Sequence, residues 1–150
     1  MKKMGLIMFL FLLLFALSGC GNDKGNSIRK KIQVSKNVSM ITVKGNGTAV
    51  YSETEKRLID REIILEETED IEVIIKAIEN STSHSGPMTS EGENFNLVFT
   101  NEDNTSETIH LWLYSDRASR IQKAMDEGVI QILNKEDAQN ISKILSEKLL

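Results

Sequence analysis

Hydrophobic residues alternate with polar ones along much of the chain after residue 30, and a period of two is typical of half-buried β-strands. The alternation predicts strands at residues 31–35, 38–44, 61–66, 95–100 and 107–114. Weaker patterns at residues 118–124 and 129–133 suggest two more. The number of short strands indicates a mostly antiparallel sheet.

Turn signals divide these strands. Gly45-Asn46-Gly47 predicts a tight turn, because Gly and Asn both tolerate positive φ. We therefore expect residues 48–52 to return antiparallel to residues 38–44 as a hairpin. Asn101–Asn104 predicts the turn of a second hairpin, between the strands at 95–100 and 107–114. Residues 80–94, which are rich in Ser, Gly and Asn, predict a mobile surface loop around Pro87.

Two segments have the helical period instead. Four isoleucines at spacing i, i+3, i+4, i+7 predict a helix at about residues 69–80, with Thr68 as its N-cap. They are Ile71, Ile74, Ile75 and Ile78. A closing helix at about residues 135–148 would begin after Asn134 and place Ala138, Ile141 and Leu145 along one side. We therefore expect an α+β fold, with both helices packed on one face of the sheet.

The first residues follow another pattern. Lys2 and Lys3 precede an uninterrupted apolar run from Leu6 to Leu17, which is typical of a signal peptide. As a helix the run is about 18 Å long, well short of a hydrocarbon core of roughly 30 Å, so a permanent membrane span is the weaker interpretation. The predicted organisation is a signal peptide at 1–19, a polar tether at 20–29 and a single domain at 30–150.

Leu17-Ser18-Gly19-Cys20 resembles the lipobox of bacterial lipoproteins. The resemblance implies diacylglyceryl transfer to the Cys20 sulfur, cleavage before Cys20 and, usually, N-acylation. Two or more acyl chains would hold the domain stably on the extracytoplasmic face of the cell membrane. The alternatives are an ordinary secretory signal with a chance cysteine, or a buried core thiol.

Composition narrows the possible functions. Cys20 is the only cysteine, so a lipidated chain has no thiol for a disulfide, thiolate catalysis or metal ligation. The net charge of −4, without a basic stripe, argues against nucleic-acid binding. His84 has no second ligand nearby in its polar loop, and no residue pattern indicates a metal or cofactor site. Catalytic motifs are also missing, so we expect no enzyme activity.

The candidate binding residues lie in the strand at 107–114. If Ile109, Leu111 and Leu113 face the core, then His110, Trp112 and Tyr114 lie together on the opposite face. This aromatic row (His110, Trp112 and Tyr114) could bind a peptide or a glycan. The alternative is structural packing, with the row covered by a loop or by the N-terminal segment.

The order of these elements resembles a known family. The lipobox, the helix ending Ile-Lys-Ala-Ile-Glu-Asn, the Phe-Asn-Leu-Val-Phe-Thr strand and His110-Leu111-Trp112-Leu113 are similar to the functionally uncharacterised YhfM-like lipoproteins of Bacillus and relatives. The resemblance implies location and fold rather than an activity. We therefore expect a membrane-anchored module that binds or scaffolds an envelope protein or glycan. The alternatives are an envelope polymer hydrolase using carboxylates and His110, or a carrier of a small ligand or metal.

Overall fold

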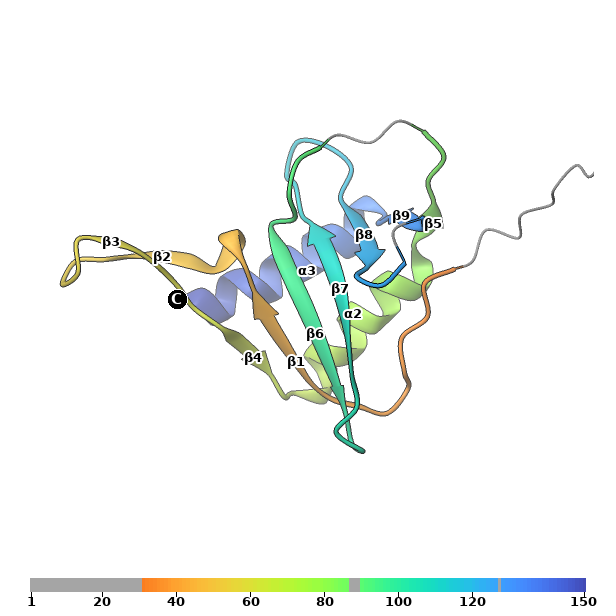
Figure 1. The fold of residues 1–150 in the computed structure, drawn as a ribbon, viewed down its shortest axis with the longest axis horizontal. Coiled ribbons are helices and arrows are strands. Elements are labelled where there is room, and N and C mark those ends of the chain that lie inside the picture. The colour runs from red at the N-terminus through yellow and green to blue at the C-terminus, as the bar shows by residue number, and fades with distance from the viewer. Residues whose placement is uncertain (1–30, 87–89, 127) are drawn as a thin grey trace, which may run out of the picture.

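The computed structural model describes residues 31–86, 90–126 and 128–150, which fold as an α+β domain. Its main sheet has seven strands in the order β4-β1-β6-β7-β8-β9-β5, and every neighbouring pair is antiparallel. Both helices lie on the same side of this sheet (Figure 1). The predicted fold class is confirmed.

The centre of the sheet follows the predicted alternation. In β6 (Phe95–Asn101), Phe95, Leu97 and Phe99 are buried while the residues between them are partly exposed. β1 (Val38–Lys44) lies between β6 and the short β4 (Ile63–Leu65), so both of its edges are paired. β6 and β7 (Ser106–Trp112) form the second predicted hairpin, in which Leu97 lies opposite Ile109.

The other half of the sheet is built from shorter strands. β8 (Arg120–Lys123) continues the sheet beyond β7, and β9 (Ile130–Ile132) pairs with β8. These confirm the two weaker strand predictions, within narrower bounds. The two-residue β5 (Thr82–Ser83) lies inside the predicted loop and closes this edge by pairing with β9.

The helices also follow the predicted stripes. α2 (Thr68–Asn80) buries Ile71, Ile74 and Ile78, and Ile75 packs partly exposed against the same core. α3 (Lys135–Leu149) begins at the predicted cap, where the Asn134 side chain accepts a hydrogen bond of 2.8 Å from the Asp137 backbone N–H. The two helices contact each other and cover the inner face of the sheet. The core therefore lies between the sheet and this helical layer.

The first predicted hairpin is wrong. β2 (Ala49–Ser52) pairs with β3 (Arg57–Asp60) in a separate two-stranded sheet, and not with β1. β4 and β6 already occupy the two edges of β1. In addition, the turn η1 (Asn46–Thr48) is fixed to β6, because the Gly47 N–H donates to the Asn94 carbonyl at 2.9 Å. The chain therefore leaves the main sheet after this turn.

Two local predictions are also corrected. Residues 31–35 form no strand, although Ile32 is buried in the core; the Ser35 N–H donates to the Glu107 carboxylate instead of a strand neighbour. α2 begins one residue earlier than expected, so Thr68 is its first residue and Glu67 is the N-cap, without a side-chain hydrogen bond. The predicted signal peptide at 1–19, the tether at 20–29 and Pro87 lie outside the described residues.

Candidate functional site

Trp112 ends β7 and is covered from several sides. Only 7% of its surface is exposed, although it lies on the face of the sheet opposite the helices. Its cross-strand neighbour Arg120 places its guanidinium 4.6 Å from the indole centroid, which is a cation–π distance. The indole N–H donates to the backbone carbonyl of Glu91 at 2.9 Å. Trp112 thus fastens the segment 90–94 onto the sheet.

Glu91 is also held by its side chain. The Tyr114 hydroxyl donates to one Glu91 oxygen at 2.9 Å, and Arg117 makes an ion pair with the same oxygen at 2.7 Å. The Arg117 guanidinium lies 3.8 Å from the centre of the Tyr114 ring. These contacts join the segment 90–94 to the connection between β7 and β8.

The hydrogen bonds between these side chains shift the pKa values of Glu91 and Tyr114. Donation from Tyr114, followed by that from Arg117, lowers the pKa of the Glu91 carboxyl below its ordinary value of 4.5. Burial raises the pKa of Tyr114, and its hydrogen bond to Glu91 raises it further. Glu91 is therefore a carboxylate, and Tyr114 a neutral donor, throughout the physiological pH range.

His110 lies beside Trp112 in a half-buried position. Its ring meets the Trp112 ring edge-on, with the centroids 6.3 Å apart and the planes at 69°. Its Nδ1 contacts the Asn96 side-chain oxygen and lies 3.6 Å from a Glu93 carboxylate oxygen. The backbone N–H of Glu93 itself, the Asn96 amide and the nearby His110 lower the pKa of the Glu93 carboxyl.

The aromatic row is therefore brought together, but its members differ in access. Trp112 is buried by the segment 90–94 and by Arg120, as the packing alternative requires. His110 and Tyr114 are only half-buried, so they are the members of the row that a ligand could reach. The aromatic row as a binding surface remains a prediction, centred on these two side chains.

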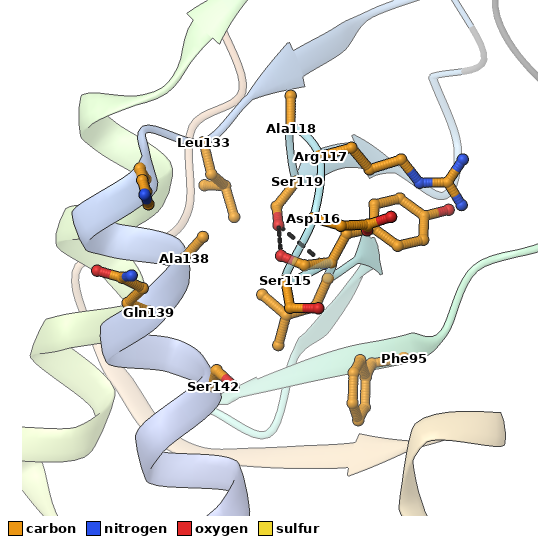
Figure 2. A pocket seen from close by; sticks show the side chains of 13 residues that line it. Phe95, Ser115, Asp116, Arg117, Ala118, Ser119, Leu133, Ala138, Gln139 and Ser142 are labelled. Carbon is orange, nitrogen blue, oxygen red and sulfur yellow. Dashed lines mark hydrogen bonds between the residues drawn. The ribbon is translucent and has the colours of Figure 1, made fainter.

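A pocket of about 650 Å³ opens next to Tyr114, between residues 113–119 and the first half of α3 (Figure 2). Its apolar wall comes from Phe95, Leu113, Leu133 and Ala138. Hydroxyl and amide groups are supplied by Ser115, Ser119, Ser142 and Gln139.

This lining suits a ligand with both apolar and hydrogen-bonding parts. Of the three charged residues in the lining, Asp116 and Lys135 have opposite signs, and the charge of the third, Arg117, is balanced by its ion pair with Glu91. Arg117 points away from α3 (Figure 2), toward its ion pair with Glu91. Ser119 is occupied as well, because its hydroxyl accepts from the Tyr114 N–H at 3.0 Å.

Sequence reasoning missed this pocket and the role of Glu91. Phe95, Ser115 and Ser142 come from three elements, and their positions in the chain carry no common motif. Glu91 lies in an irregular segment, and its sequence context has no local signal that marks it as the partner of Trp112, Tyr114 and Arg117. Only the packing of α3 against the β7–β8 connection creates the pocket.

The other residues considered from the sequence are easily placed. Cys20 lies outside the described residues. His84 is exposed, and within residues 31–86, 90–126 and 128–150 no three His, Cys, Asp or Glu side chains gather as a metal site would require. None of the helices in the described part of the chain is long and apolar enough to cross a membrane.

Comparison with known proteins gives one match. A family model described as YhfM protein matches residues 43–150, from the end of β1 through α3. No curated protein and no solved structure matches the chain. The matched range covers more than half of the sequence and includes both helices, the aromatic row and the pocket. The chain belongs to the YhfM family.

Proposed function

We propose that this protein is a lipoprotein that holds a binding domain on the extracytoplasmic face of the cell membrane. The observation that carries the proposal is Leu17-Ser18-Gly19-Cys20, placed directly after two lysines and a short apolar run. Acyl chains on Cys20 anchor the protein, and the folded domain faces the envelope. Its role is to bind or scaffold an envelope protein or glycan, without catalysis of its own.

The pocket beside Tyr114 supports binding as the role of the domain. Its volume of about 650 Å³ lies in the range of small-ligand sites, and its wall combines apolar side chains with hydroxyl and amide groups. Tyr114 belongs both to the aromatic row and to the pocket lining. A ligand in the pocket would therefore contact the accessible end of the row.

The anchor is tested by replacing the lipidated sulfur in the full chain. Cys20→Ala should abolish incorporation of labelled fatty acid and leave unprocessed precursor or release protein to the medium. Ser18→Ala is the matched control, because it keeps a small residue before the cysteine and should still be processed. Unchanged membrane retention of the Cys20→Ala protein would refute the lipid anchor.

The binding role is tested by filling the pocket. A photo-crosslinking residue at Ser115 in the membrane-bound full chain should capture an envelope protein or glycan. Ser142→Trp should abolish the capture, because Ser142 lines the pocket, while Ser146→Trp, one turn further along α3, should not. Capture that is insensitive to both substitutions, or release of cell-wall fragments by the purified protein, would contradict the proposal.

A further inference from the structure

Arg117 and Tyr114 present three hydrogen-bond donors at the rim of the pocket. Both residues belong to the pocket lining, and Arg117 points away from α3 (Figure 2). All three donors meet one carboxylate, that of Glu91. Arg117 Nη2 and the Tyr114 hydroxyl lie 2.7 and 2.9 Å from one of its oxygens, and Arg117 Nη1 lies 3.3 Å from the other. A planar guanidinium that reaches both oxygens is a geometrically specific partner for a carboxylate.

The chain itself occupies these donors, but it holds them weakly. The side chains of Arg117 and Glu91 are 47% and 48% exposed, and ion pairs in such positions contribute little to stability. The backbone of Glu91 is held independently, because its carbonyl accepts from the Trp112 indole N–H at 2.9 Å. The Glu91 carboxylate can therefore leave Arg117 by rotation of its own side chain, while the segment 90–94 stays on the sheet.

Charge restricts what can replace Glu91. Arg117 and Tyr114 lose their acceptor when the Glu91 carboxylate leaves, and a neutral group would accept only weaker hydrogen bonds from them. A carboxylate from a ligand restores these contacts and balances the charge of Arg117. No further charge is needed, since the other two charged residues of the lining, Asp116 and Lys135, have opposite signs. The exchange therefore selects a ligand with a single carboxylate.

We propose that Arg117 and Tyr114 bind the C-terminal carboxylate of an envelope polypeptide, and that Glu91 occupies their donors in the free protein as a tethered competitor. This assignment rests on the proposed binding function and specifies the ligand of the same pocket. Beside the carboxylate, the apolar wall of the pocket receives the last side chain of the polypeptide. The hydroxyl and amide groups of the lining, which belong to Ser115, Ser142 and Gln139, suit its peptide groups.

An acidic sugar carries the same carboxylate but fits this lining less well. A sugar ring packs its C–H face on an open aromatic side chain, and the two aromatic residues of the lining are already engaged. The Arg117 guanidinium lies over the Tyr114 ring at 3.8 Å. Phe95 is only 8% exposed, and its ring packs so closely on Gly47 that a side chain there would meet it. The lining therefore favours a peptide over a glycan.

Titration calorimetry of the detergent-solubilised full chain tests the ligand class. The peptide acetyl-Ala-Ala-Leu with a free C-terminus should bind about tenfold more tightly than its C-terminal amide, which lacks the carboxylate, and than glucuronate, which lacks the apolar side chain. Arg117→Gln should remove the preference for the free C-terminus. Arg57→Gln is the matched control, since Arg57 makes an exposed ion pair with Glu55 on the β2–β3 hairpin. Equal affinities for the three compounds, or a preference that Arg117→Gln leaves unchanged, would overturn the proposal.

Removal of the competitor tests the role of Glu91. Glu91→Gln should bind the free peptide about fivefold more tightly, because an occupied site lowers the apparent affinity, whereas Glu55→Gln should leave the affinity unchanged. Equal affinities of the two variants, or no binding of the free peptide, would overturn the proposal. Capture by the photo-crosslinking residue at Ser115 that Ser142→Trp abolishes would then still support the binding function. Unchanged melting temperatures confirm that each variant is folded.

Discussion

At the scale of single residues, Trp112 illustrates how a side chain on the outer face of a sheet becomes part of the interior. Strand alternation places it away from the helical layer, yet the segment 90–94 and Arg120 leave it only 7% exposed. The indole N–H is satisfied by the Glu91 carbonyl, which removes the cost of burying an unpaired donor. Trp112 therefore contributes to stability.

Trp112→Ala should lower the free energy of unfolding by about 3 kcal/mol, because a large buried side chain is lost and a cavity is left behind. Trp112→Phe keeps much of the apolar contact but loses the N–H donor, so its loss should be only about 1 kcal/mol. Urea unfolding followed by circular dichroism measures both. A loss below about 0.5 kcal/mol for the alanine variant would show that Trp112 packing is dispensable.

Glu91 and Glu93 make the segment 90–94 sensitive to acid. Their pKa values lie below the ordinary value of 4.5, so each carboxylate stabilises the folded state at pH values above 4.5. This contribution is lost as the pH falls from 4.5 through the lower pKa of the folded protein. The contacts of Tyr114, Arg117 and His110 with the segment should weaken in the same interval.

Below pH 4.5 we therefore expect Trp112 fluorescence to shift toward that of a solvated indole before the domain unfolds. Trp112 is the only tryptophan, so its emission reports this region alone. Glu91→Gln should reduce the pH dependence, whereas Glu53→Gln, on the β2–β3 hairpin, should leave it unchanged. If Trp112 fluorescence has the same pH dependence in the unaltered protein, the Glu91→Gln variant and the Glu53→Gln variant, the role of Glu91 is contradicted.

At the scale of elements, the two helices begin differently. The Asn134 side chain caps α3 by accepting from the Asp137 backbone N–H. Thr68 has the residue type of a cap, but it is already the first residue of α2, and Glu67 before it makes no side-chain cap bond. Residue type alone could not show that Asn134 caps its helix and Thr68 does not, because capping depends on the position at which the backbone enters the helix.

Asn134→Ala should lower the free energy of unfolding by about 1 kcal/mol, since the Asp137 N–H loses its acceptor. Thr68→Ala is the matched control, and we expect a change within about 0.5 kcal/mol, because no capping bond is lost. Chemical denaturation of both variants measures the difference. Equal losses would mean that Thr68 also caps its helix in solution.

At the scale of the whole molecule, stability should be distributed unevenly. β1, β6 and β7 each lie between two neighbouring strands and bury their inner residues beneath the helices. β2 and β3 have only each other, and Tyr51 and Leu58 are exposed. Local opening therefore requires far less free energy in the hairpin than in the central strands.

In hydrogen exchange of dilute protein, the amides of β2 and β3 should exchange well before those of β6. Mass spectrometry of peptides from residues 49–60 and 95–101 provides the comparison. Equal protection of the hairpin and β6 in dilute protein would contradict this distribution of stability.

Much of the fold could be predicted because it depends on local patterns. The isoleucine stripe of α2 and the Phe-x-Leu-x-Phe alternation of β6 specify both the element and its buried face within a few residues. The same alternation failed at residues 31–35, where Ile32 reaches the core without a strand partner. Hydrophobic alternation therefore identifies which side chains are buried, but it does not identify the segment with which the backbone forms hydrogen bonds.

The sequence by itself therefore determined the α+β class, the two helices, the inward face of the central strands and the outward position of His110 and Trp112 in β7. The tertiary structure decided that β2 pairs with β3, that Trp112 is covered, and that a pocket lies beside α3. The physical reason is competition between distant segments. β4 and β6 occupy both edges of β1, and only the assembled sheet can show that β2 has no place there.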